Sequence, residues 1–410
     1  MPQRITGDYE RTSVGGEEVK AFVPRALPPR NPPVTIDAAL SERLRAAEQG
    51  LLRLELAGDM VPSVDWFLYA FVRKEAVLSS QIEGTQATLV DLLAFEAEGS
   101  GEGGAPPNAD VEEVCNYLDA LTFAREQLVE PKGLPLSMRL LNATHERLMR
   151  GGRGAQKQPG EIRRTQNWLG GSRPGNAAHV PPPAHALGKT LAAFEKYLHG
   201  NDPQPPLVRA GLLHVQFETI HPYLDGNGRL GRLLVTLLFE HWKLLTKPLL
   251  YLSLFFKRHR AEYYRRLTAV RVEGDWEGWL DFFLDGVATI ADEAAVSARE
   301  LFALVTADRV RLLAREEMSL AALRLFELLP RHPVVTIASV RTLLETTKPT
   351  AGRAVELLVT GGVLVETTGR RRDRSFAYQR YLEHLRVGTE LGERERERVV
   401  VAVPGRRRRR

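Results

Sequence analysis

Residues 221–232, HPYLDGNGRLGR, bring together side chains that are suited to phosphate chemistry. His221 has an imidazole that titrates near neutrality, which suits a general base that takes a proton from a hydroxyl. Asp225 supplies a hard carboxylate oxygen of the kind that Mg²⁺ prefers. Arg229 and Arg232 are three positions apart, so in a helix they lie on one face, where two cations can meet several phosphates.

Gly226, Asn227 and Gly228 predict a tight turn beside these charged residues. Glycine adopts positive φ angles without steric cost, so successive backbone amides can point inward as a nest for an anion. A leucine-rich helix follows at once, and its N-terminus adds free amides and a positive dipole end. The helix before it, LVRAGLLHVQFETI, is expected to end at His221-Pro222, because a residue before proline avoids helical angles. The pattern therefore predicts a phosphate site between two helices.

In this order the residues resemble the motif of the Fic family, HxFx(D/E)GNGRxxR. One position departs from it, because Tyr223 stands where phenylalanine is usual, and its added hydroxyl needs a hydrogen-bond partner. The resemblance implies a mainly α fold: an all-helical Fic core with a short β-hairpin flap. It also implies a protein adenylyltransferase that uses ATP and Mg²⁺ to move AMP to a Ser, Thr or Tyr hydroxyl of a target protein.

The resemblance further implies a role for each motif residue. His221 would deprotonate the target hydroxyl, and Asp225 would hold Mg²⁺. The nest at 226–229 would bind the α and β phosphates, with Asn227 at the α phosphate, and Arg232 would bind the γ phosphate. Phosphoryl-type transfer needs such an arrangement, because it depends mostly on positioning and on neutralising the charge of phosphate oxygens.

A second stretch, SSQIEGT at 79–85, matches the inhibitory motif of the family, (S/T)xxxE(G/N), through Ser79, Glu83 and Gly84. By itself, Glu-Gly at the end of a helix indicates only a cap. In the family this glutamate pairs with the last arginine of the motif, which is Arg232 here. The carboxylate would take the partner that the γ phosphate needs, so the resemblance implies self-inhibition within one chain.

Two further segments resemble functional parts of the family. Residues 160–185 resemble the flap that pairs with the backbone of the target, although an ordinary Gly- and Pro-rich surface loop also fits this composition. Residues 255–267 resemble the stretch that closes over the adenine, with His259 where asparagine is usual. Tyr263 and Tyr264 fit a place in the core as well as a stacking role.

Apolar spacing and composition divide the chain into four predicted regions. Residues 1–110 form an N-terminal arm and a helical region with the inhibitory motif, and the first 36 residues are expected to be extended. The resemblance implies a Fic core over 111–314. Residues 315–385 give the order helix, helix, strand, turn, strand, which is a winged helix-turn-helix pattern. Residues 386–410 are a basic tail that is expected to be disordered.

The composition is that of a soluble globular protein, with 43% hydrophobic and 26% charged residues. The only cysteine, Cys115, excludes a disulfide framework and favours a reducing, cytoplasmic location. The longest apolar stretch, 244–256, is too short to span a bilayer, and no signal peptide is expected. The net charge of +5 equals that of the tail from Glu393 onward, so the overall charge does not indicate nucleic-acid binding.

Two alternative functions also fit the sequence. The core could be a nucleotide-sensing module of a DNA-binding regulator, with the arginines of 370–374 on the wing tip. An intact His221 favours the enzyme, because a sensor needs no base. The same core could instead remove AMP from a modified protein, with Glu83 orienting water. Winged helices also serve as dimerisation or docking modules, so both DNA contact and a homodimer are compatible with this sequence.

Overall fold

A computed structural model describes residues 4–59, 64–98, 108–151, 154–370 and 373–391. The chain divides into two compact units, each made of two segments. Unit 1 is Met1–Ala57 with Asn116–Ala295, and unit 2 is Gly58–Cys115 with Val296–Arg410. The chain passes between the units within three helices, which are α1 (Ala38–Asp59), α4 (Ala109–Val129) and α11 (Trp276–Leu313). The boundaries of the four regions expected from the sequence stay predictions.

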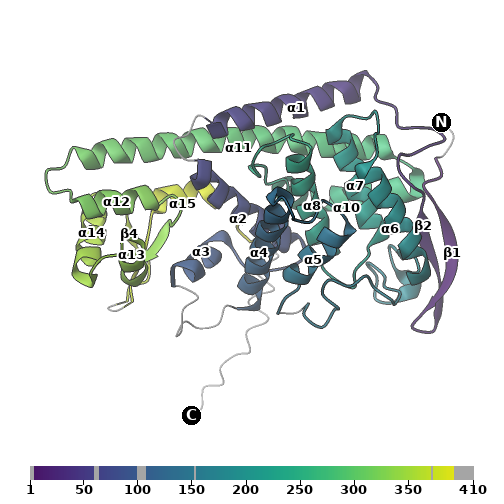
Figure 1. The fold of residues 1–410 in the computed structure, drawn as a ribbon, viewed down its shortest axis with the longest axis horizontal. Coiled ribbons are helices and arrows are strands. Elements are labelled where there is room, and N and C mark those ends of the chain that lie inside the picture. Colours follow the sequence, from purple (N-terminus) through teal and green to yellow (C-terminus); the bar gives the residue numbers. More distant parts are fainter. Residues whose placement is uncertain (1–3, 60–63, 99–107, 152–153, 371–372, 392–410) are drawn as a thin grey trace, which may run out of the picture. The chain divides into compact units, whose positions relative to one another are not determined.

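Both units are mainly helical, as predicted (Figure 1). The other helices of unit 1 are α5 (Met138–Leu148), α6 (Ala184–His199), α7 (Pro206–Ile220), α8 (Asn227–His241), α9 (Ser253–Arg258) and α10 (Arg260–Glu273). Those of unit 2 are α2 (Val64–Ile82), α3 (Leu89–Glu98), α12 (Leu320–Leu328), α13 (Ile337–Leu343), α14 (Lys348–Thr360) and α15 (Gln379–Leu385). In the described ranges, no helix has the length and apolar character that crossing a membrane requires.

The core of unit 1 forms around α7, which is buried on nearly every side. Gly211 lets α7 approach α11 closely, because a Cβ atom there would lie 3.0 Å from Leu280 Cδ2. Trp279 of α11 donates its indole N–H to the Gly211 carbonyl at 2.9 Å. His214 packs against the Trp279 ring with centroids 5.7 Å apart, and its Nε2 hydrogen-bonds the Tyr263 hydroxyl at 2.8 Å. Tyr263 is therefore a core residue.

The first part of the chain, expected as an extended arm, is a two-stranded antiparallel sheet. β1 (Gly7–Val14) pairs with β2 (Glu17–Pro24) over its whole length. The connecting residues Gly15 and Gly16 have φ angles of 58° and 84°. A Gly-Gly pair between two extended runs is a signal for a tight hairpin, so the sequence did contain evidence for this sheet.

Residues 160–185 reverse direction as a flap would, but with one β-bridge in place of a regular hairpin. The segment turns through the short 3-10 helix η1 (Pro174–Asn176), and the bridge joins Leu169 to His179. A backbone N–H of β2 donates to the Val180 carbonyl at 2.8 Å, so the N-terminal hairpin braces the returning half. The high Gly and Pro content explains why longer strands do not form.

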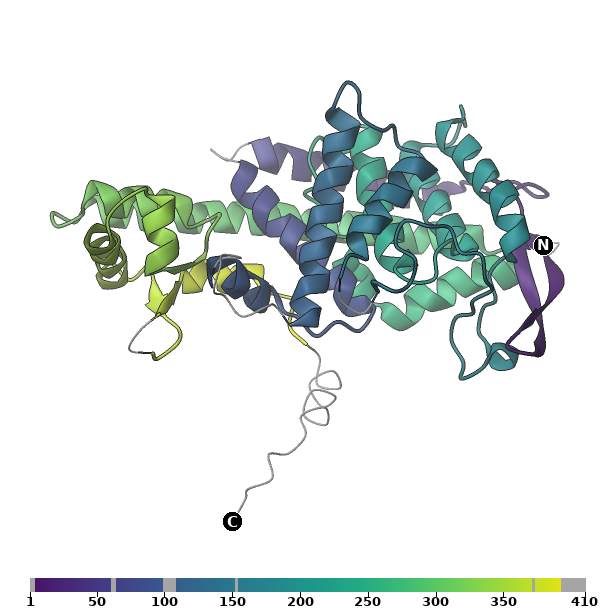
Figure 2. The same ribbon diagram turned by 60° about the horizontal axis from the view of Figure 1, so that its bottom comes forward.

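Residues 320–377 combine three helices with a small antiparallel sheet (Figures 1 and 2). The chain order is α12, β3 (Val334–Thr336), α13, α14, β4 (Val365–Glu366) and β5 (Ser375–Ala377), and the sheet order is β3-β5-β4. The expected order of helix, helix, strand, turn, strand is present from α13 onward, after one additional helix and strand. The winged-helix assignment stays a prediction, and two of its wing-tip positions, 371–372, lie outside the described residues.

Residues 386–391, at the start of the predicted tail, contact other parts of unit 2. Thr389 is 1% exposed, and its backbone N–H donates to the Arg386 carbonyl at 2.8 Å. Its own carbonyl accepts a hydrogen bond from Gln81 Nε2 at 2.8 Å. The arginine-rich remainder, 392–410, lies outside the described residues.

Asp308, in the unit 2 part of α11, is a buried carboxylate that joins this helix to the C-terminal region. It is 2% exposed. Its oxygens accept hydrogen bonds from the Tyr378 hydroxyl at 2.8 Å, from Arg311 at 2.8 Å and from Arg380 at 3.0 Å. Burial and the neighbouring carboxylate raise the pKa of Tyr378. Asp308 is therefore the common acceptor of three donors.

We expect Asp308→Ala to reduce the free energy of unfolding by about 2 to 4 kcal/mol, because the buried Tyr378 hydroxyl and two cations lose their acceptor. Denaturant unfolding followed by circular dichroism measures this loss. The matched control is Glu327→Ala, which removes an ion pair of half-exposed side chains with Arg309 and should cost no more than about 1 kcal/mol. Equal effects of the two variants would contradict this role of Asp308.

Candidate active site

The loop 221–226 connects α7 to α8 through two residues in the left-handed conformation. His221 caps the end of α7 with φ 48° and ψ 61°, and its N–H donates to the Phe217 carbonyl at 2.9 Å. Gly226 caps the start of α8 with φ 75°. Pro222 keeps the first helix from continuing, as predicted. Because α7 and α8 pack on each other, the imidazole and the helix N-terminus belong to the same short turn.

Gly226 is required by both backbone and space. Its positive φ favours glycine, and a Cβ atom would lie 2.5 Å from Met149 Sδ and 3.3 Å from His145 Nε2. The predicted turn is therefore present at this glycine. Gly228, in contrast, lies within the first turn of α8, which begins at Asn227.

Asn227 braces the loop with its side chain. Its Oδ1 accepts the Tyr223 N–H at 2.9 Å, and its Nδ2 donates to the Tyr223 carbonyl at 2.8 Å. Its side chain is thus already committed to the loop. The first amides of a helix have no acceptor within the helix, so the expected contact of Asn227 with the α phosphate would use its backbone N–H, followed by those of Gly228 and Arg229.

Arg229 and Arg232 lie on α8 next to this N-terminus, and both are buried. Arg229 Nη2 is 3.5 Å from Met149 Sδ. Two guanidinium groups and the positive end of the α8 dipole together favour an anion at this place. The cations predicted to bind phosphate are therefore present beside the turn.

Asp225 is exposed at the rim of the loop, and its Oδ1 accepts the Gly226 N–H at 2.6 Å. Mg²⁺ in nucleotide sites is usually bound by one or two carboxylates together with phosphate oxygens and water. Asp225 fits the protein's share of such a site. Among the described residues, no three His, Cys, Asp or Glu side chains form a separate metal cluster.

His145 of α5 holds the loop from outside the motif, and the sequence did not reveal this role. Its Nδ1 accepts the Gly160 N–H at 2.9 Å, so its Nε2 carries the proton and donates to the Asp225 carbonyl at 2.9 Å. Its ring stacks on that of Tyr223 with centroids 3.8 Å apart. Burial lowers the pKa of His145 to about 4, so the imidazole is neutral at pH 7.

The Tyr223 hydroxyl has the partner that the sequence required. It donates to Asn142 Oδ1 at 2.7 Å, and the side chain is fully buried. Burial raises the pKa of Tyr223, so the hydroxyl stays protonated. The departure from the usual phenylalanine therefore adds one anchor between the loop and α5.

Arg163 is the second residue that sequence reasoning missed. It is 1% exposed, and its Nε donates to the His221 carbonyl at 2.9 Å. Its backbone N–H donates to the Pro222 carbonyl at 2.9 Å. Its Nη2 donates to the Pro182 carbonyl at 2.6 Å, so it joins the flap to the motif loop. In the sequence Arg163 is one of two adjacent arginines, and no local pattern distinguishes it from Arg164.

The inhibitory motif forms the end of α2 in unit 2. Ser79 is buried near the end of the helix, and Gly84 follows it with φ 99°. The Gly84 N–H donates back to the Gln81 carbonyl at 3.0 Å, which is a glycine cap. Glu83 stands directly before this cap. Arg232 belongs to unit 1, so its pairing with Glu83 stays a prediction.

His259 lies at the junction of α9 and α10 and is exposed. Its ring is 4.5 Å from that of Phe255. Tyr264, on the following helix, is 40% exposed, in contrast to the buried Tyr263. The adenine contact of His259 stays a prediction.

Comparison with known proteins identifies the class to which this turn and this helical fold belong. Residues 41–126 match the N-terminal model of the Fic/DOC family, and residues 135–239 match the Fic/DOC family model itself. Residues 41–126 thus form a Fic/DOC N-terminal region, and residues 135–239 form a Fic/DOC domain. The second match includes the whole motif, Met149, His145 and Arg163.

Individual relatives agree with this assignment. The protein adenylyltransferase Fic of Culex quinquefasciatus is 30% identical over 204 residues, which are 45% of this chain and 37% of that protein. The protein of the same name from Nematostella vectensis is 30% identical over 161 residues, 38% of this chain and 35% of that protein. The chain thus spans about a third of the length of these curated relatives.

A solved structure shares the fold. The crystal structure of a Fic family protein from Desulfovibrio desulfuricans G20 superposes with a TM-score of 0.54 at 23% identity. The match covers 85% of this chain and 98% of that one.

We expect acid to destabilise the protein through His145, because its folded pKa of about 4 lies below the unfolded value of 6.5. This contribution is complete above pH 6.5, declines as the pH falls, and is lost below about pH 4. Between pH 7 and pH 5 the wild type should lose about 2 kcal/mol more than His145→Gln, which does not titrate. Denaturant unfolding at both pH values measures the difference. Equal losses would show that His145 is not held neutral.

Proposed function

We propose that this chain is a self-inhibited protein adenylyltransferase, which transfers AMP from ATP to a Ser, Thr or Tyr hydroxyl of a target protein. The observation that carries the proposal is the turn between α7 and α8. It joins an imidazole, a helix N-terminus and two buried arginines within one Fic/DOC motif. Relatives that share this region bear the name of protein adenylyltransferases.

His221 is the base of the proposed reaction. It takes the proton of the target hydroxyl, and the oxygen attacks the α phosphorus of ATP. The new bond is P–O to the target, and the bond that breaks joins the α phosphorus to the bridging oxygen of pyrophosphate, which leaves. His221 is half-buried at the end of α7.

The N-terminus of α8 binds the phosphates. The backbone amides of 227–229 face the α and β phosphates, and Arg232 pairs with the γ phosphate. Asp225 would hold Mg²⁺, which would supply positive charge for the leaving pyrophosphate. In this proposal one residue of the motif transfers the proton, and the other groups bind the phosphates and Mg²⁺.

Glu83 is the inhibitory residue of the proposal. Its carboxylate pairs with Arg232 and so removes the γ-phosphate partner, which leaves ATP in an unproductive position. The glycine cap supports this role, because α2 ends at Ile82 and the backbone N–H groups of Glu83 and Gly84 donate back to the last turn of the helix, which gives Glu83 a defined backbone position. Removal of AMP, DNA contact and a homodimer stay predictions.

We expect Glu83→Gly to raise self-modification with labelled ATP by about tenfold or more, which corresponds to about 1.4 kcal/mol of relieved inhibition. Adding His221→Ala should abolish transfer and leave ATP binding intact, because the base contacts the hydroxyl. Adding Arg232→Ala should cancel the rise. Incorporated label and ATP affinity are measured on the same preparations.

The matched control is Glu98→Gly, which removes another glutamate at a helix end of unit 2 and should leave the rate unchanged. Transfer by the His221→Ala variant at the full rate would disprove the proposed reaction. An unchanged rate in Glu83→Gly, with transfer that depends on His221, would disprove the inhibition alone.

A further inference from the structure

Arg163 is an unusual side chain for the interior of a protein. Burial lowers its pKa to about 10, and no ion pair of Arg163 is found among the described residues. A charge without a counter-ion is costly to bury, so its donors must be satisfied by other means. They are satisfied by carbonyl groups of the main chain.

These carbonyl groups belong to two different segments. On one side, Nε donates to His221 at 2.9 Å and the backbone N–H donates to Pro222 at 2.9 Å. On the other side, Nη1 donates to Thr165 at 3.2 Å and Nη2 to Pro182 at 2.6 Å. Thr165 and Pro182 lie at the two ends of the flap. One planar, rigid group therefore connects the motif loop with both ends of the flap.

The contacts of Arg163 to the loop lie at a residue with an unfavourable backbone conformation. His221 has φ 48°, a conformation that residues other than glycine rarely adopt and keep only when their surroundings hold it. Arg163 holds the carbonyl of His221 and the next carbonyl along the chain. Two successive peptide planes are thereby fixed, and with them the direction in which the imidazole leaves the backbone.

We propose that Arg163 is the positioning residue that sets His221 relative to the flap. This inference rests on the proposed function, in which the flap receives the target and His221 deprotonates its hydroxyl. Arg163 touches neither ATP nor the reacting atoms. Its loss should therefore lower kcat and leave the KM for ATP nearly unchanged, because the α8 N-terminus binds the nucleotide.

The test uses Arg163→Ala and Arg163→Lys in the Glu83→Gly chain. We expect kcat to fall tenfold to a hundredfold in the alanine variant, as a displaced base would cause, with the KM for ATP changed less than twofold. Guanidinium ion should restore part of the rate, and sodium chloride at equal ionic strength should not. Arg53→Ala is the control, because this arginine of α1 has a side chain that is 51% exposed, lies outside the flap and the motif, and should behave as the parent in every measurement.

Hydrogen exchange gives a readout that does not depend on the reaction. Arg163→Ala should speed exchange in 163–183 and 220–223 and leave the later turns of α8 unchanged. A folded variant with parental kcat and parental exchange would overturn the inference. If the alanine variant does not fold, the lysine variant decides in the same way. If the Glu83→Gly parent transfers no AMP, the proposed function fails, and exchange alone decides the role of Arg163.

A second, independent observation concerns α2, the helix that ends in the inhibitory turn. Gln81, two residues before Glu83, is buried and donates through Nε2 to the Ala87 carbonyl at 2.9 Å and to the Thr389 carbonyl at 2.8 Å. Near the start of α2, Asp65 forms an ion pair with Arg331. Both ends of the inhibitory helix therefore contact the C-terminal part of the chain, within unit 2.

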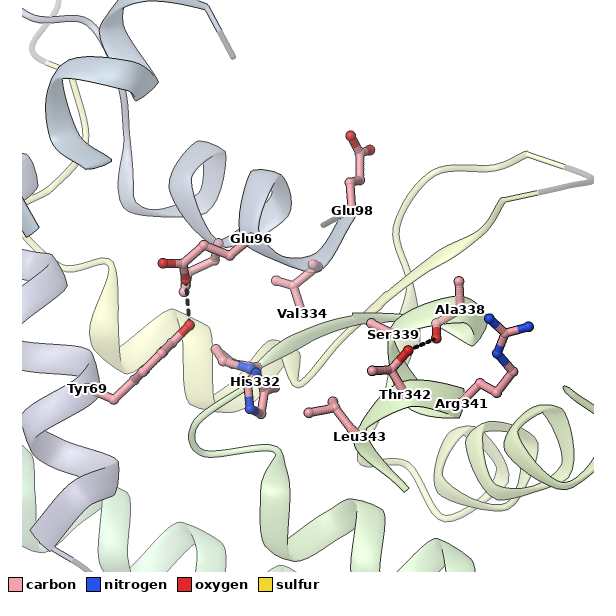
Figure 3. Close-up of a pocket in the computed structure, with 13 residues that line it drawn as sticks. Tyr69, Glu96, Glu98, His332, Val334, Ala338, Ser339, Arg341, Thr342 and Leu343 are labelled. Atoms are coloured by element: carbon pink, nitrogen blue, oxygen red, sulfur yellow. Dashed lines mark hydrogen bonds between the residues drawn. The ribbon is translucent and has the colours of Figure 1, made fainter. Parts of the chain in front are cut away.

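The two contacts differ in strength. The start of α2 borders a cavity of about 320 Å³ (Figure 3). In the lining of this cavity the Tyr69 hydroxyl donates to the Glu96 carboxylate, and the ring centroids of Tyr69 and His332 are 6.1 Å apart. The Asp65 ion pair is exposed, and exposed pairs contribute little. The bond between Gln81 and Thr389, in contrast, is buried and lies beside the inhibitory turn.

We infer that residues 386–391 hold the inhibitory turn, so that the C-terminal region controls Glu83. This inference also rests on the proposed function. A chain that ends after Leu385 loses the Thr389 carbonyl, and a chain that ends after Leu391 keeps it. We expect the shorter chain to show self-modification raised at least threefold and the longer chain to match the full-length protein.

The same truncations in the Glu83→Gly chain test whether the effect of residues 386–391 passes through Glu83. The shorter chain should add no further rise in that background, because the inhibitory carboxylate is already absent. Equal activity of the two truncated chains, with equal hydrogen exchange in 79–87, would overturn the inference. If Glu83→Gly has no effect, inhibition through Glu83 is disproved, and faster exchange in 79–87 of the shorter chain alone tests the attachment.

Discussion

The site depends on one reversal of the chain, the turn between α7 and α8 with left-handed residues at both ends. His221 ends the first helix and Gly226 begins the second. Asn227 closes the turn by binding both backbone groups of Tyr223. Because Asn227 holds the main chain of Tyr223, the His221 imidazole and the N-terminus of α8 share one braced loop.

Two buried side chains then fix this loop in the fold. His145 donates to the carbonyl of Asp225, and Arg163 donates to that of His221. Burial lowers the pKa of both side chains, and both donate hydrogen bonds to main-chain carbonyl oxygens. Replacing either by an apolar residue would leave buried carbonyl groups without donors, so the two side chains contribute to the stability of the loop as well as to its geometry.

The division into two units separates the proposed chemistry from its proposed control. The motif, the flap and the residues that brace them belong to unit 1, whereas the inhibitory turn belongs to unit 2 together with the C-terminal helices and sheet. The inhibitory helix therefore shares its packing with the C-terminal region.

The sequence by itself determined the helices, the turn at residues 221–232 and the identity of its charged residues. These features depend on neighbours in the chain, through apolar period, a proline after His221 and a glycine where φ must be positive. Only the tertiary structure decided that His145 and Arg163 hold this turn. They lie 80 and 58 positions from the carbonyls they bind, and no local rule predicts which distant donor meets a given carbonyl. That choice follows from how the helices pack.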